Sequence, residues 1–220
     1  MSILLRTTIM LSSMFFIYTS ALAEINDDIK QLQDEWAEVK YNLDEKKQEA
    51  ALEKLSLKAA AIIKAQPENA DAYLWEGIIL STYAGAIGTL RALKAVTQSK
   101  EALEKSLEID PNSSNGSANT YLGTLYFLVP EWPIAFGDLE LAKEYLDKAI
   151  ALTPDDIDAN FFYADFQKKI KRYSAAEASY KKAIAAPSRP GRELADAGRR
   201  KEAQERMEKM LKKIQETPNI

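Results

Sequence analysis

The sequence predicts an all-α protein, built as a stack of helical hairpins. Three prolines, Pro67, Pro111 and Pro154, each follow an amphipathic helical segment rich in alanine and leucine. Proline ends a helix because it lacks an amide hydrogen and its ring clashes with the preceding turn. A small residue recurs ten to twelve positions after each proline, in segments rich in aromatic residues. A small side chain at such a position lets two helices approach closely, which favours paired helices over isolated ones.

The second helix of each pair carries a further repeat, a small, a large and a small residue followed by proline. The positions are Ala142, Leu146, Ala149 and Pro154, then Ala176, Tyr180, Ala183 and Pro187, and more loosely Ser99, Leu103, Ser106 and Pro111. Together with Gly77, Gly123 and Ala164 in the first helices, this pattern resembles the tetratricopeptide repeat (TPR). The resemblance implies a right-handed superhelical stack that binds a partner and is not an enzyme.

The spacing of the prolines departs from a regular repeat. Successive prolines are 44, 43 and 33 residues apart, whereas a tetratricopeptide repeat has about 34 residues. We therefore expect three hairpins over residues 67–187. The first two should carry insertions of about ten and about seven residues between their paired helices, judged against that period.

The first 23 residues have the pattern of a cleavable signal peptide. Arg6 gives a positive start, an apolar stretch follows, and Ala21-Leu22-Ala23 precedes an abruptly charged segment. We expect cleavage after Ala23 and a mature chain in the periplasm. An uncleaved anchor is the alternative, but the apolar core is shorter than the roughly 20 residues that a spanning helix needs. No later segment is long and apolar enough to cross a membrane.

Residues 24–66 are expected to form amphipathic helices, and whether these make a degenerate repeat stays open. A first helix has one apolar stripe, made by Ile25, Ile29, Leu32, Trp36, Val39 and Leu43. A second helix would place Leu55, Ala59 and Ile62 on one side. The stripe suits either docking on the core or a coiled-coil seam, and its short length favours docking.

Residues 188–220 are expected to form a C-terminal capping helix, from about Leu194 to Gln215. Its apolar side would carry Met207, Met210, Leu211 and Ile214, and such a helix covers the otherwise exposed end of a solenoid. A basic cluster lies nearby. For Arg189, Arg192, Arg199, Arg200 and Lys201, solvent exposure or interhelical pairing is favoured over an anion site.

The first insertion, residues 83–96, contains Gly85 and Gly88 in a segment of small residues. Because glycine weakens a helix unless a bend or a close contact requires it, we expect a break there. A second helix should follow, running through about Val96.

The second insertion, residues 129–138, has two prolines three positions apart and ends in Gly137-Asp138. It cannot be helical throughout. Trp132, Ile134 and Phe136 either pack on their own hairpin or present aromatic groups to a ligand, and packing is favoured. Asp138 should cap a helix that begins near Leu139.

The composition excludes several chemistries. The chain has no histidine and no cysteine, which removes the usual zinc, copper and haem ligands and the common nucleophile arrangements. We therefore expect no cofactor, no metal site and no enzymatic activity. Paired carboxylates are present in number but nothing singles out a catalytic pair, and Asp155-Asp156 is interpreted as helix capping. With a formal net charge of −4, nucleic acid is excluded as a partner.

The resemblance implies a concave binding surface formed by the first helices. Its residues would be Leu74, Ile78, Thr120, Thr124, Phe127, Phe161 and Asp165, bordered by Trp132 and Phe136. The mixed polarity suits a peptide or an elongated small molecule. The leading hypothesis is an adaptor for a protein or peptide in the cell envelope. The alternative is an accessory carrier of an apolar small molecule, associated with a solute transporter.

Overall fold

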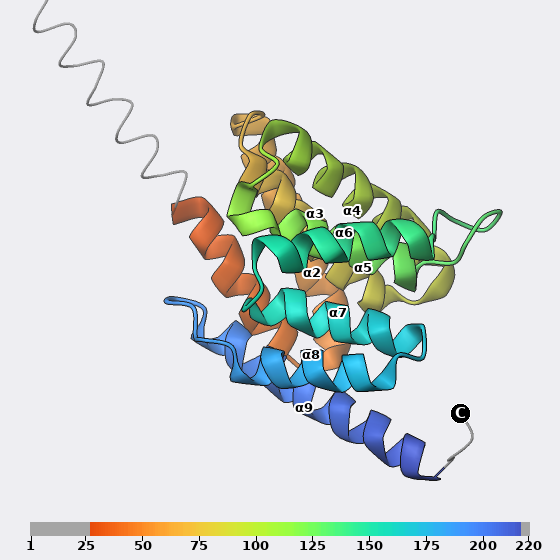
Figure 1. Ribbon diagram of the computed structural model, residues 1–220. Helices are drawn as coiled ribbons and strands as arrows, with labels where there is room; N and C mark the ends of the chain where they lie inside the picture. Colours follow the sequence, from red (N-terminus) through yellow and green to blue (C-terminus); the bar gives the residue numbers. More distant parts are fainter. Residues whose placement is uncertain (1–26, 217–220) are drawn as a thin grey trace, which may run out of the picture.

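The computed structural model describes residues 27–216, and the predicted signal segment lies outside them. The described chain forms a helix over residues 27–41 and then labelled helices (Figure 1). These are α2 (Glu45–Ala65), α3 (Ala70–Ile87), α4 (Thr89–Ile109), a short 3₁₀ turn (Ser113–Gly116), α5 (Ser117–Leu128), α6 (Leu139–Leu152), α7 (Ile157–Lys169), α8 (Tyr173–Ala185) and α9 (Glu193–Glu216). The fold is an all-α stack of helical hairpins.

The small residues of the first helices hold the hairpins together. A Cβ at Gly77 would lie 2.5 Å from the Leu103 side chain of α4, and one at Gly123 would lie 2.6 Å from Leu146 of α6. Ser99 also donates a hydrogen bond of 2.7 Å to the Gly77 carbonyl. Any larger side chain at Gly77 or Gly123 would push the paired helices apart. The predicted close approach is confirmed.

The third hairpin, α7–α8, is the regular one, with 13 residues in each helix. Ala164 of α7 packs against Ala176, Tyr180 and Ala183 of α8, and all four are fully buried. Asp156 caps α7, because its side chain accepts a hydrogen bond from the Ala159 amide at 2.9 Å. Helix capping was expected for Asp155-Asp156, and it is confirmed for Asp156.

The N-terminal hairpin docks on the stack. Leu32 and Trp36 are buried, and the Trp36 ring meets Trp75 of α3 edge to face at 5.8 Å. On α2, Leu55 and Ala59 are buried. The apolar stripe therefore packs on the core of the same chain, which confirms docking over a coiled-coil seam.

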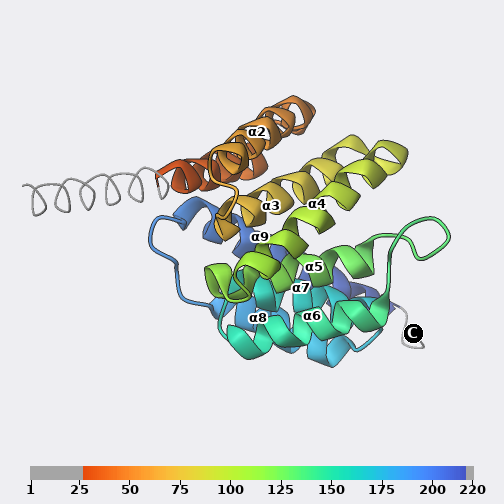
Figure 2. The same cartoon turned by 90° about the horizontal axis from the view of Figure 1, so that it is seen from above.

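Helix α9 lies across the stack rather than only at its end (Figure 2). Its N-terminal half reaches the first helix, because a Cβ at Gly198 would overlap the Tyr41 ring. Further along, Met207 and Met210 pack against the third hairpin. The C-terminal helix thus connects the last hairpin to the N-terminal one. Across residues 27–216, no helix has the length and apolarity needed to span a membrane.

The two insertions fold differently. The predicted break in the first is confirmed at Gly88, which has φ of 76° and separates α3 from α4. A separate helix ending near Val96 is wrong, since α4 continues without interruption to Ile109. The second insertion, residues 129–138, is an irregular loop that projects from the body beside α5 and α6 (Figure 1).

Candidate functional site

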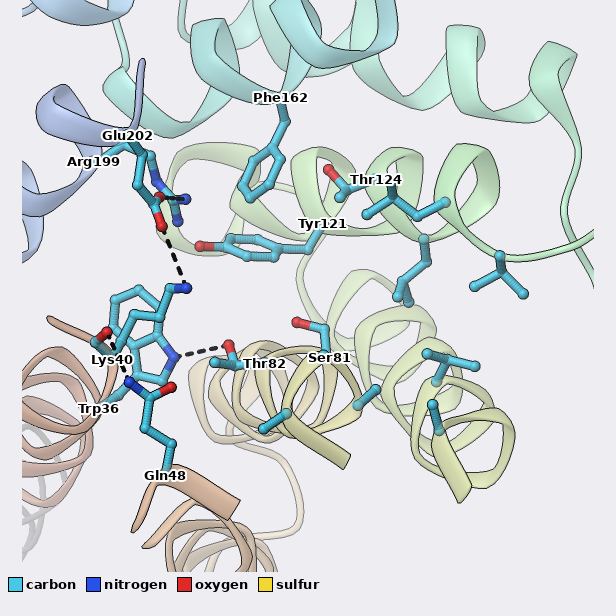
Figure 3. Close-up of a pocket in the computed structure, with 18 of the residues that line it drawn as sticks. Trp36, Lys40, Gln48, Ser81, Thr82, Tyr121, Thr124, Phe162, Arg199 and Glu202 are labelled. Atoms are coloured by element: carbon cyan, nitrogen blue, oxygen red, sulfur yellow. Dashed lines mark hydrogen bonds and ion pairs between the residues drawn. The ribbon is translucent and has the colours of Figure 1, made fainter. Parts of the chain in front are cut away.

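A partly open pocket of about 810 Å³ lies where the inner sides of the hairpins meet the first helix and α9 (Figure 3). Its volume falls in the range of small-molecule and peptide side-chain sites. The first helix, α2, α3, α4, α5, α7 and α9 all contribute residues, as does the loop after α5. The lining comprises Trp36, Lys40, Glu45, Gln48, Ser81, Thr82, Ala84, Gly85, Ala86, Ala92, Leu93, Val96, Tyr121, Thr124, Leu125, Leu128, Val129, Pro130, Phe162, Arg199, Glu202 and Arg206.

One wall of the pocket is apolar and comes largely from the first insertion. The end of α3 contributes Ala84, and the beginning of α4 contributes Ala92, Leu93 and Val96. Without the extra turns that the insertion adds to α3 and α4, these residues would be absent. The lengthened hairpin therefore creates the apolar wall.

The opposite wall is polar, and its groups bind one another. The Trp36 indole donates a hydrogen bond of 3.0 Å to the Thr82 hydroxyl. Lys40 pairs with Glu202 at 3.3 Å, and Glu202 also accepts from Arg199 at 2.6 Å. These charges compensate one another within the wall. The pocket thus combines an apolar surface with polar groups and has no strong excess of one charge.

A buried ion-pair network holds α9 in the position that completes the pocket. Arg199 donates to Asp158 at 2.7 Å, and Arg189 donates to the same carboxylate at 3.0 Å and to Asp196 at 2.6 Å. Burial favours the neutral form of Asp158, but Arg199 and Arg189 outweigh it and hold the pKa of Asp158 well below its usual range. Burial by itself would lower the pKa of Arg199, and Asp158 raises it well above its usual value. Both groups therefore stay charged.

Arg199 also packs on two aromatic rings, of which only that of Phe162 lines the pocket. Its guanidinium lies 4.5 Å from the Phe161 ring centre and 4.8 Å from that of Phe162. The hydroxyl of Tyr121 stays neutral, because burial raises the pKa of Tyr121 well above its usual value. For the basic cluster, interhelical pairing of Arg189 and Arg199 confirms the expectation that was favoured over an anion site.

The loop of the second insertion borders the pocket through Val129 and Pro130. Its base is fixed: the Gly137 amide donates to the Pro130 carbonyl at 2.9 Å, and the Asp138 amide donates to the Tyr126 carbonyl at 2.9 Å. A Cβ at Gly137 would overlap the Val129 carbonyl. Asp138 then caps α6 by accepting from the Glu140 and Leu141 amides, as predicted.

The apolar side chains of this loop divide into two groups. Phe136 packs on its own hairpin, edge to face with Tyr126 at 5.5 Å. In contrast, Trp132 is 86% exposed and Ile134 is 68% exposed, next to Leu128 at 65%. The favoured interpretation was that these side chains pack on their own hairpin. It is confirmed for Phe136, whereas Trp132 and Ile134 project into solvent.

Of the residues assigned to a binding surface from the sequence, only Thr124 lines the pocket. The others of the first helices were expected on an open surface, and the structure corrects that placement. Leu74, Ile78, Thr120, Phe127, Phe161 and Asp165 are buried. Neighbouring helices cover them, and α9 contributes to this at Phe161 and Asp165, so their role here is packing. Contact of these residues with a partner stays a prediction.

Asp165 is the only acidic residue among these six. It accepts hydrogen bonds from the Tyr180 hydroxyl at 2.5 Å and from Lys168 at 2.7 Å, and it pairs with Arg206 of α9. Its position joins α7, α8 and α9. It therefore acts as a structural anion rather than as a group that faces the pocket.

Lys40, Thr82 and Glu202 were not foreseen as site residues. Each is a common polar residue on a helix, and its partner in the pocket wall belongs to a different helix, so no local pattern marks it. One signal was present: glycine is unfavourable inside a helix, and Gly198 in the N-terminal part of α9 indicates a close approach. Within residues 27–216, no cluster of acidic residues could hold a metal ion.

Comparisons with known proteins agree with this architecture. The tetratricopeptide repeat family matches residues 134–187. A solved thermophilic TPR protein from Thermus thermophilus superposes with a TM-score of 0.52 at 17% identity, covering 86% of this chain and 94% of that one. A MamA crystal structure is similar at a TM-score of 0.45 and 21% identity, covering 80% of this chain and 96% of that one. The chain matches no curated protein sequence. Residues 134–187 thus match the tetratricopeptide repeat, and the fold as a whole is similar to that of a TPR protein.

Proposed function

We propose that this protein is a non-enzymatic adaptor that binds a protein or peptide partner through the pocket and the adjoining loop. One observation carries the proposal. The loop of residues 129–138 is fixed at its base, lines the pocket with Val129 and Pro130, and exposes Trp132 and Ile134 to solvent. Grouped exposed apolar side chains, unlike single ones, are typical of interaction sites, and these two lie two positions apart in one loop.

The rigidity of the loop supports a protein partner. Backbone hydrogen bonds at Gly137 and Asp138 and the packing of Phe136 fix the loop before binding. The loop then loses less conformational entropy when a partner binds. Tryptophan is also the residue type that most often dominates the binding energy of protein interfaces. The general role of TPR folds in protein interaction agrees with this assignment.

The pocket supports an uncharged or apolar segment of that partner. Lys40 and Arg199 are already compensated by Glu202 and Asp158. A charged ligand would have to replace these pairs, whereas an apolar side chain can fill the wall formed by Ala92 and Val96 without doing so. A peptide bound along the exposed loop could extend into the pocket.

The test is site-specific photo-crosslinking in the native cell envelope. A photoreactive side chain at position 132 should give a reproducible protein adduct, identified by mass spectrometry. Leu57 provides the matched control, because it is 68% exposed on α2. Equal adducts from both positions, or none from position 132, would contradict the adaptor.

An accessory carrier for an apolar small molecule, associated with a solute transporter, is the second candidate. The volume of about 810 Å³ and the apolar wall favour it. Native mass spectrometry of the mature protein, purified from its own envelope, should then detect a bound metabolite. Ala92→Phe, which narrows the pocket, should remove that metabolite. The carrier would replace the adaptor if the unchanged protein co-purifies with a metabolite, Ala92→Phe loses that metabolite, and position 132 gives no protein adduct.

We also propose a periplasmic location, which rests on the signal pattern of residues 1–23. The mature protein recovered from the periplasmic fraction should begin at Glu24. An intact Met1 terminus in the membrane fraction would instead support an uncleaved anchor.

A further inference from the structure

A second hollow lies further along α9, between the C-terminal half of this helix and the start of α8. It has a volume of about 450 Å³ and is lined by Lys168, Tyr173, Arg206, Lys209, Met210, Lys213 and Ile214. Four of these seven residues are cations and none is an acid. The five from α9 follow the three- and four-residue spacing of one helix face.

The positive charge of this hollow is only partly compensated. Lys168 and Arg206 share one carboxylate, that of Asp165. Lys209 and Lys213 form no ion pair with any of residues 27–216. They lie four residues apart on α9, an arrangement of like charges that slightly destabilises a helix. The hollow therefore holds excess positive charge at a small cost to the helix.

Three other cations of α9 pair with acids on the same helix, and Arg200 donates hydrogen bonds to the Ala186 carbonyl and the Ser188 hydroxyl. Arg199 pairs with Glu202, Lys201 with Glu205 and Lys212 with Glu216. Among the cations of α9, Lys209 and Lys213 alone have neither an ion pair nor a hydrogen bond to any side chain or carbonyl of the described residues. General surface charge does not explain it.

Neighbouring residues extend the positive region. The α7–α8 turn carries Lys169, Lys171 and Arg172, which form no ion pair within the described chain. Figure 1 shows this turn at the same side of the molecule as the C-terminal half of α9. The whole chain has a formal net charge of −4. The basic region is therefore opposite in sign to the net charge of the protein.

The floor of the hollow is apolar. Met210 is buried, and Tyr173 and Ile214 are partly buried beside it. An anion alone would use the rim but leave this floor uncovered. A ligand with both negative charge and an apolar group would contact the lysines and the floor together.

We propose that this hollow binds an acidic peptide segment that inserts one apolar side chain between its acidic residues. The carboxylates would pair with Lys209 and Lys213 at the rim, and the apolar side chain would rest on Met210 and Ile214. A flat anionic membrane fits the geometry less well, because a bilayer surface reaches the rim but not a floor inside a hollow. The site shares Arg206 with the pocket of the proposed adaptor, but Lys209 and Lys213 do not line that pocket. Variants at these two lysines therefore test this site separately, and either assignment can fail without the other.

The experiment measures fluorescence anisotropy of a labelled peptide with one leucine flanked by glutamates, added to the folded protein without its signal segment. Binding should weaken as salt rises. Replacing the leucine with serine, or the glutamates with lysines, should weaken it at least about tenfold, equivalent to about 1.4 kcal/mol. Equal binding of the serine peptide would overturn the role of the apolar floor.

The matched variants are Lys209→Glu with Lys213→Glu, and Lys181→Glu with Lys201→Glu as control. All four positions are exposed, and both pairs change the net charge equally. The first pair should weaken peptide binding at least about tenfold, while the control pair should leave it within about twofold. Equal loss in both would reduce the effect to net charge and overturn the site. Binding to phosphatidylglycerol vesicles but not to the peptide, lost in the first pair, would overturn the peptide in favour of a membrane.

Discussion

The two insertions occupy equivalent places in successive hairpins yet have opposite structures. The first lengthens both helices of its hairpin, to 18 residues in α3 and 21 in α4, against 13 in each helix of the regular third hairpin. The second leaves α5 and α6 at 12 and 14 residues and forms a loop between them. The position in the repeat therefore does not decide the structure of an insertion. Its composition does.

The physical reason lies in a few residues. Residues 89–96 are good helix formers apart from β-branched ends, whereas Pro130 and Pro133 cannot continue a helix. The consequences for the surface are opposite as well. The first insertion supplies the apolar wall of the pocket through Ala92 and Val96, and the second exposes Trp132 outside it. Substitutions in the two segments can test this contrast.

The largest effect is expected from Gly137→Ala in the second insertion. A Cβ there would overlap the Val129 carbonyl, and the backbone must move because no flexible side chain can give way. Unfolding free energy should fall by about 2–3 kcal/mol, the upper part of the usual range for overpacking. Chemical denaturation measures this. Unchanged stability, together with unchanged hydrogen exchange at the Asp138 amide, would show that the loop base is not fixed as described.

Gly88→Ala tests the turn of the first insertion. Gly88 has φ of 76° and ψ of −179°, a conformation that residues other than glycine rarely adopt, although the space around it is open. The cost should come from the backbone alone, about 1–2 kcal/mol. Thermal and chemical unfolding of the variant would measure it. A neutral result would mean that α3 and α4 can join without this conformation.

Gly85→Ala should have the opposite sign. This glycine lies inside α3, and an added Cβ meets nothing within 4 Å. Alanine in a helix is more favourable than glycine, so stability should rise by about 0.5–1 kcal/mol. The same unfolding measurement decides it, with Gly88→Ala as the neighbouring comparison. A destabilised variant would indicate that Gly85 requires a backbone conformation outside the helical region.

Trp132→Ala should produce the smallest change in stability. Since the side chain is 86% exposed, its removal should alter the unfolding free energy by no more than about 0.5 kcal/mol. Phe136→Ala is the control, because that ring packs on Tyr126 and its loss should cost more. A large loss of stability in Trp132→Ala would place the tryptophan in the core and remove the main support for the adaptor.

Much of the fold could be predicted because its signals are local. Gly77 and Gly123, the spacing of Ala142, Leu146 and Ala149, and the caps at Asp138 and Asp156 each reflect a contact within one hairpin or one helix end. The candidate site could not be predicted in the same way. Thr124 was identified, but Leu74 and Phe161 proved to be core, and Lys40 and Glu202 were not considered.

The sequence by itself determined the hairpins, their insertions and the ends of the helices, because short-range periodicity, proline and glycine dictate these features. Only the tertiary structure decided that α9 crosses to the N-terminal hairpin, with Gly198 against Tyr41 and Arg199 paired with Asp158. Helix α9 places Arg199 and Arg206 over Phe161, pairs Arg206 with Asp165, and completes the pocket. The contacts behind this crossing join residues far apart in the chain, and their strength depends on mutual burial, which no local pattern encodes.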